Sequence, residues 1–146
     1  MIVKFLVAFG YLLSMPCNLM LMLFAGETVY NIHQLTADRT NPMETSEHLN
    51  EFIPFEYITH AVSTFLFIIS WQVFAIIMNV PLLAYHIYMY VTRPMASAQG
   101  IYDPTTIIQR SKMQTIRRIS WIKFGFYLIM FCYYLYSAIY ILGRYK

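Results

Sequence analysis

Charged residues are scarce in this chain of 146 residues. Asp, Glu, Lys and Arg together make up 12% of it, whereas hydrophobic residues make up 59%. Soluble domains usually contain about 25% charged residues, so the composition excludes an ordinary soluble globular domain. The chain is also too short to hold both a soluble domain and several membrane spans. We therefore predict a single integral membrane domain over residues 1–146.

Glycine and cysteine are also scarce, with five and two residues. The glycines are scattered and form no phosphate-binding loop, and no paired-cysteine zinc motif is present. Cys17 and Cys132 lie within apolar runs, where thiols behave as small apolar side chains, so we expect no disulfide between them. No nucleophile stands beside a base. The sequence therefore indicates no catalytic, cofactor, metal or nucleic-acid site.

Three runs contain no Asp, Glu, Lys or Arg: Phe5–Ala25 with 21 residues, Tyr57–Thr92 with 36 and Phe124–Gly143 with 20. A hydrocarbon core of about 30 Å is crossed by about 20 helical residues. The first and last runs therefore each predict one transmembrane helix. The first run is longer than the apolar region of a signal peptide, which has about 7 to 15 residues, so we expect it to remain as a span.

The middle run is too long for one comfortable span and short for two. As a single helix its 36 residues would reach about 54 Å. The sequence Asn-Val-Pro at Asn79–Pro81 offers a break, because proline removes a backbone donor and disfavours helical angles in the residue before it. We therefore predict a tight helical hairpin at Asn79–Pro81, between a span over Glu56–Met78 and a shorter one ending near Thr92. This gives an all-α membrane protein with four transmembrane helices; one kinked middle helix, and so three spans, is the alternative.

The distribution of positive charge predicts the orientation. Six Lys and Arg residues lie from Arg93 to Lys123, and such clusters face the cytoplasm. With four spans, both termini then face the lumen or the exterior, and the acidic loop over residues 31–54 lies on the cytoplasmic side. With three spans, the amino terminus would be cytoplasmic and that loop luminal.

His60 and His86 are the histidines within the predicted spans. Ionisable residues inside a membrane often mark a proton pathway or a metal site. Counted from the predicted hairpin, His60 lies about 28 Å deep and His86 about 9 Å deep. Ligands about 20 Å apart in depth do not share one metal ion. We therefore expect each histidine to be a hydrogen-bonded packing or interface residue.

Aromatic residues are abundant, at 18% of the chain, and ten residues are Met. In the last run, Tyr127, Tyr134 and Ala138 recur at helical spacing. Such a stripe fits lipid contact with interfacial aromatic belts. It fits equally a surface that packs against other membrane helices. The sequence leaves both interpretations open.

Several motifs together resemble those of the cornichon family. They are FLVAFGYLL, IPFEYITH, NVPLLAYHIYMY, GIYDPTTI and IKFGFYLIMFCYYLYSAIY, and their order and spacing match over nearly the whole chain. The family consists of receptors that bind membrane cargo for export from the endoplasmic reticulum and recruit the COPII coat. Some animal members are also auxiliary subunits of AMPA-type glutamate receptors and slow their gating. The resemblance implies four spans with luminal or extracellular termini, and no enzyme activity.

The resemblance also implies which residues meet partners. Cargo contacts are expected on the first two spans, at Phe5, Phe9, Tyr57, Ile58 and His60. Coat contacts are expected in the basic cytoplasmic segment, at Ile107, Ile108 and Met113. Fungal relatives carry an Ile-Phe-Arg-Thr-Leu signal where this chain reads IIQRSKM. This chain also lacks the insert between the first two spans that strongly receptor-modulating vertebrate members carry.

These observations predict a non-enzymatic cargo receptor in the lipid bilayer of the endoplasmic reticulum and early secretory pathway. They also predict an auxiliary subunit of AMPA-type glutamate receptors, which would take it to the plasma or postsynaptic membrane. The alternative function is a small channel or transporter subunit. That class needs several buried ionisable residues facing a cavity, and the predicted spans contain few.

Overall fold

The computed structural model describes residues 2–94 and 100–144. It contains four helices, α1 (Ile2–Thr36), α2 (Pro42–Ile69), α3 (Val73–Val91) and α4 (Arg110–Gly143). Each is long and apolar enough to cross a membrane. The prediction of an all-α membrane protein with four transmembrane helices is therefore confirmed, and the three-span alternative is wrong.

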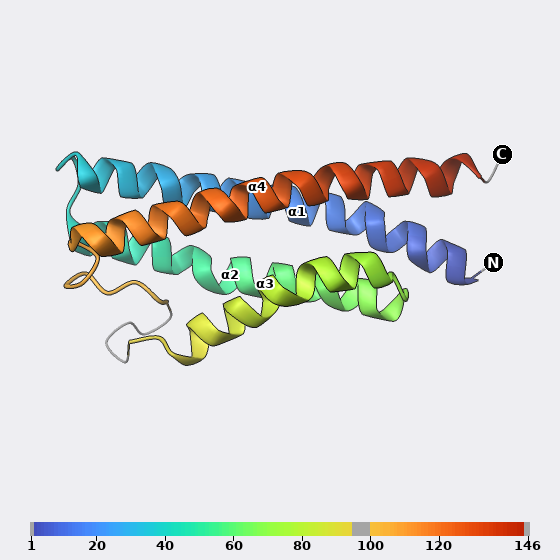
Figure 1. The fold of residues 1–146 in the computed structure, drawn as a ribbon, viewed down its shortest axis with the longest axis horizontal. Helices are drawn as coiled ribbons and strands as arrows, with labels where there is room; N and C mark the ends of the chain where they lie inside the picture. The colour runs from blue at the N-terminus through green and yellow to red at the C-terminus, as the bar shows by residue number, and fades with distance from the viewer. Residues whose placement is uncertain (1, 95–99, 145–146) are drawn as a thin grey trace.

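The helices form an elongated bundle in which α1 and α4 run antiparallel and side by side (Figure 1). α1 also packs against α2, and α2 packs against α3. The start of α1 and the end of α4 lie at the same end of the bundle as the α2–α3 turn, whereas the α1–α2 connection and the start of α4 lie at the opposite end (Figure 1). We call the first the terminal end and the second the basic end, because the second carries the start of α4 with Arg110 and Lys112.

The turn between α2 and α3 lies at Ser70–Gln72, so its predicted position at Asn79–Pro81 is wrong. Trp71 has a φ of 55°, and the Gln72 N–H donates to the Phe67 carbonyl, which closes the end of α2. Pro81 lies within α3, just as other prolines lie within α1 and α2. Proline is tolerated inside membrane helices because neighbouring groups satisfy the freed backbone. It therefore does not mark the turn here.

Near the terminal end, α1 is joined to the α2–α3 turn by Tyr11. Its ring is buried against Phe67 and Tyr134. Its hydroxyl donates to Gln72 Oε1 at 2.9 Å. Tyr127, Tyr134 and Ala138 are also buried within the bundle. The aromatic stripe of α4 therefore packs against this chain's own helices.

At the basic end, the segment before α4 is fixed to α2 by Asn50. The Asn50 side chain donates to the Tyr102 carbonyl at 2.8 Å and accepts from the Tyr102 N–H at 2.9 Å. Gly100 approaches so closely that an added Cβ would lie 2.0 Å from Asn50 Oδ1. The Asp103 carboxylate accepts from the Thr105 hydroxyl and N–H, and these bonds hold the pKa of Asp103 below its usual value. The motif GIYDPTTI thus has a structural role.

Candidate functional site

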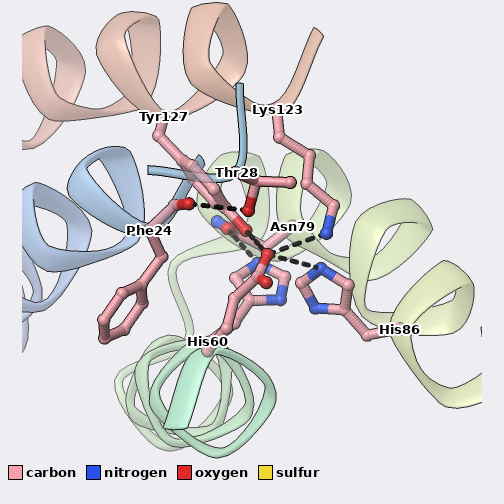
Figure 2. Close-up of polar contacts among 8 residues, drawn as sticks. Phe24, Thr28, His60, Asn79, His86, Lys123 and Tyr127 are labelled. Atoms are coloured by element: carbon pink, nitrogen blue, oxygen red, sulfur yellow. Dashed lines mark hydrogen bonds and ion pairs between the residues drawn. The ribbon is translucent and has the colours of Figure 1, made fainter. Parts of the chain in front are cut away.

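Polar side chains are buried where α2, α3 and α4 meet, and this group is the buried polar cluster. Its members are Glu56 and His60 on α2, Asn79 and His86 on α3, and Lys123, Tyr127 and Tyr134 on α4. Within each helix the members are four or seven residues apart, so they share one face. Figure 2 shows the labelled side chains of Lys123, Tyr127, His60 and His86 converging from these three helices.

The centre of the cluster is an ion pair between α2 and α4. Lys123 Nζ donates to Glu56 Oε1 at 2.8 Å, and the two side chains are only 9% and 7% exposed. The Tyr127 hydroxyl donates to the same oxygen at 3.4 Å. His86 Nε2 lies 3.5 Å from it, which is long for a hydrogen bond. Because opposite charges compensate each other, the pair is compatible with a site that excludes water.

Asn79 connects all three helices of the cluster. Its Oδ1 lies 3.1 Å from His60 Nε2, and its Nδ2 donates to the Tyr134 hydroxyl at 2.8 Å. A further bond at 2.8 Å goes to the Ala75 carbonyl within α3. Asn79 therefore holds α3 against α2 and α4, which is a different role from the predicted turn.

The two histidines are neighbours, with ring centroids 5.0 Å apart, so the predicted separation in depth is wrong. The error follows from the turn. Counted from Trp71, His60 and His86 lie about 16 Å and 22 Å deep, which places them at similar levels. Within residues 2–94 and 100–144, no three His, Cys, Asp or Glu side chains form a group suited to a metal ion.

The residues expected to bind cargo lie at different levels of the bundle. Phe5 and Phe9 are 68% and 48% exposed on α1, with their rings stacked at 6.4 Å. Phe9 directly precedes Gly10, which faces Ser70 at the α2–α3 turn. Ile58 is exposed on α2 about 18 Å further toward the basic end. The structure therefore does not bring the aromatic pair of α1 and the α2 residues into one site.

A groove between α2 and α3 includes two of the expected cargo residues. This α2–α3 groove has a volume of about 500 Å³ and is lined by Pro54, Tyr57, Ile58, Ala61, Leu83, His86, Ile87, Tyr90 and Val91. Most of these side chains are apolar. His60, in contrast, is buried under this chain's own helices and is not among the lining residues. Tyr57 and Ile58 therefore reach the outer surface, and His60 does not.

The residues expected to bind the coat differ strongly in exposure. Ile107 is 1% exposed and packs in a small core at the basic end with Ile32, Leu49 and Ile116. Ile108 is 54% exposed. Met113 packs at the edge of the same core. Of the three, Ile108 is the most exposed and so the most accessible to a partner. Ile107 lies outside the spans but is buried, so it is not accessible.

Glu56 and Lys123 belong to the buried polar cluster, but the sequence did not indicate them as site residues. Each residue directly precedes an uncharged run, which is also where a boundary of the hydrocarbon region is expected. A detectable signal was the spacing of four residues between Glu56 and His60 and between Lys123 and Tyr127, which places polar groups on one helical face. The partner of each face, however, depends on how the helices pack.

Comparison with known proteins agrees with the resemblance of the motifs. A family model described as "Cornichon protein" matches residues 8–136. Protein cornichon homolog 1 of Caenorhabditis elegans is 50% identical over 135 residues, which cover 92% of this chain and 93% of that protein. Protein cornichon of Drosophila melanogaster is 36% identical over 133 residues, with 91% and 92% covered. These matches and the four membrane-spanning helices show that the chain belongs to the cornichon family.

Proposed function

We propose that this protein is a non-enzymatic membrane cargo receptor for export from the endoplasmic reticulum in COPII-coated vesicles. We include in the proposal a role as an auxiliary subunit of AMPA-type glutamate receptors. The observation that carries it is membership of the cornichon family over most of the chain. A bundle of four spans with long exposed apolar faces is consistent with a protein that binds other membrane helices.

The stacked pair Phe5 and Phe9 is the first cargo-contacting surface in this proposal. Both rings are exposed, and they lie four residues apart on one face of α1. Large exposed aromatic side chains often anchor interfaces. Tyr57 and Ile58 on α2 form a second surface, about 18 Å away along the bundle. A cargo helix that touches both would run along the bundle rather than across it.

The coat would act on the basic end. Clustered Lys and Arg predict that this end is cytoplasmic, which puts both termini in the lumen or the exterior. Ile108 is the exposed residue of the expected coat segment, and Arg110 and Lys112 follow it at the start of α4. We assign coat contact to this surface and a packing role to Ile107.

A vesicle-budding assay tests the proposal. Microsomes that contain this protein and a co-expressed AMPA-type receptor subunit are incubated with purified COPII components. We expect the subunit to co-purify with the protein in mild detergent and to enter vesicles more efficiently than from microsomes without it. Ile108→Asp should reduce packaging and leave co-purification unchanged. Equal packaging with and without the protein would contradict the export role.

A matched pair of variants locates the cargo surface. Phe5→Ala with Phe9→Ala removes two exposed rings, so capture should fall by roughly tenfold if each ring is a packed anchor. Ile129→Ala with Ile139→Ala removes two side chains from exposed positions of α4 and serves as the control. Equal recovery of the receptor subunit with both double variants would place the contact elsewhere.

The buried polar cluster favours the alternative, a small channel or transporter subunit. Glu56, His60, His86 and Lys123 supply the buried ionisable groups that such a function needs. Glu56 and Lys123, however, compensate each other's charge at 2.8 Å. We therefore rank this function second. Proteoliposomes containing the purified protein should show no more ion or proton flux than empty vesicles, and a flux abolished by Glu56→Gln would reverse the ranking.

A further inference from the structure

A polar pocket lies between the end of α1 and the start of α4, and we call it the arginine pocket. It has a volume of about 160 Å³ and is lined by Thr36, Arg110, Met113, Gln114 and Arg117. All of these side chains except that of Met113 carry a polar or charged group, whereas the α2–α3 groove is mostly apolar. A ligand of the arginine pocket is therefore recognised through charge and hydrogen bonds.

The two guanidinium groups of the pocket lack an anionic partner in this chain. α4 contains no Asp or Glu, and within residues 2–94 and 100–144 only Lys123 of its basic side chains makes an ion pair. Arg117 is half-buried, yet among the described residues neither it nor Arg110 makes a side-chain hydrogen bond or an ion pair. Because the planar guanidinium group binds phosphate through two parallel hydrogen bonds, the pocket is complementary to phosphate.

The arginine pocket lies on a face of α4 that continues into the hydrocarbon region. Arg110, Gln114, Arg117, Trp121 and Leu128 recur at intervals of three, four or seven residues, so they share one face of the helix. Trp121 and Leu128 are exposed, and tryptophan is typical of the membrane interface. This order of side chains matches a phospholipid that lies along α4, with an acyl chain at Leu128 and its headgroup beyond Trp121.

The distance of the pocket from the hydrocarbon restricts the kind of headgroup. The uncharged run of α4 begins at Phe124, and Arg117 lies about 10 Å before it along the helix. The headgroup layer is about 5–8 Å thick on each side, so a glycerol-linked phosphate reaches the side chain of Arg117 but not that of Arg110. A headgroup with a second phosphate, carried outward on a ring, reaches both. We propose that the arginine pocket binds the headgroup of a phosphorylated inositol phospholipid, with ring hydroxyls at Thr36 and Gln114.

Quenching of Trp121 fluorescence by brominated lipids tests this proposal. Trp71→Phe, at an exposed position, leaves Trp121 as the one tryptophan of the chain, and the purified full chain is reconstituted in phosphatidylcholine vesicles. Dibrominated phosphatidylinositol 4-phosphate should bind beside Trp121 about tenfold more strongly than dibrominated phosphatidylcholine, the ratio expected from one charge-assisted hydrogen bond. Dibrominated phosphatidylserine lacks the second phosphate and should bind less strongly than the inositol lipid. No coat protein or cargo is present, so the outcome is independent of the proposed function.

Matched double variants separate the pocket from general attraction between charges. Arg110→Gln with Arg117→Gln should remove the preference for the inositol lipid. Lys112→Gln with Arg118→Gln removes the same charge from α4 at exposed positions outside the pocket and should largely preserve it. Equal losses in the two double variants would overturn the proposal, as would equal binding of phosphatidylserine and the inositol lipid.

A soluble competitor distinguishes a membrane lipid from a free phosphate compound. Inositol 1,4-bisphosphate carries the same phosphates without acyl chains, so it should displace the brominated inositol lipid only weakly. Displacement as efficient as that by the unlabelled lipid would mean that the ligand comes from solution, and it would overturn the assignment to a phospholipid.

Discussion

The ion pair between Glu56 and Lys123 gives a prediction about stability. Among the described residues, Lys123→Met leaves the Glu56 carboxylate with the Tyr127 hydroxyl at 3.4 Å and the long contact from His86. Glu56→Leu leaves a buried ammonium group that has no opposite charge beside it within residues 2–94 and 100–144. Removing one member of a buried pair typically costs about 3–5 kcal/mol. Since the pair directly precedes the uncharged runs and a lysine side chain can extend toward the membrane boundary, we expect about 2–4 kcal/mol for each single variant.

A double variant distinguishes the attraction between the two charges from the cost of burying one unpaired charge. Replacing both residues with apolar ones of similar volume, as in Glu56→Leu with Lys123→Met, leaves no unpaired charge. Such replacements are often neutral or stabilising. We therefore expect the double variant within about 1 kcal/mol of the wild type, whereas additive losses of the two single variants would sum to about 4–8 kcal/mol.

The measurement is unfolding in mild detergent, by heat and by titration with dodecyl sulfate. A loss of about 3 kcal/mol corresponds to a fall in Tm of roughly 6–12 °C for a chain of this size. Lys112→Met, at an exposed position of α4, is the control and should change stability by less than about 0.5 kcal/mol. Additive losses in the double variant would refute the reasoning, because they would mean that the two charges do not stabilise each other.

Three further predictions follow from the packing. Ile107→Ala should destabilise the protein by about 2–5 kcal/mol, whereas Ile108→Ala should change it by less than about 0.5 kcal/mol; denaturation of both variants checks this. Gly100→Ala should displace the segment before α4, because its Cβ would overlap an α2 side chain, and faster hydrogen exchange around residue 102 would reveal it. Tyr11→Phe loses the hydrogen bond to Gln72, so we expect a loss of about 0.5–1.5 kcal/mol in the same denaturation assay, and unchanged stability would contradict it.

The sequence was sufficient to favour four spans over three, because a run of 36 uncharged residues is too long for one comfortable span. The 36 uncharged residues of the middle run do form two helices. The sequence was insufficient, however, to locate the turn between these two helices. A proline inside a membrane helix and a proline at a turn have the same local sequence, and only the packing of α2 against α3 distinguishes them. The observed turn at Ser70–Gln72 contains neither proline nor glycine.

The misplaced turn also hid the buried polar cluster. Moving the turn from residue 80 to residue 71 brings His60 level with His86. It also brings Asn79 beside His60, and Glu56 within 3.5 Å of His86. A charged residue next to an apolar run looks the same in sequence whether its side chain faces water at the membrane boundary or pairs with an opposite charge inside the bundle. The partner of each charge depends on helix register, which hydrophobic periodicity does not determine.

α3 depends on polar contacts more than the other helices do. Its close packing is against α2, and Asn79 joins it to both α2 and α4. Hydrogen bonds between membrane helices average about 0.6 kcal/mol and reach about 1.7 kcal/mol, so Asn79→Leu, which removes two of them at nearly constant volume, should cost about 1–3 kcal/mol. Because α1 and α4 pack together without this residue, the loss should be local. We expect faster hydrogen exchange in α3 and unchanged exchange along α1, while Val80→Leu, at an exposed position, should affect neither. Equal acceleration in all four helices would mean that Asn79 supports the bundle as a whole rather than the position of α3.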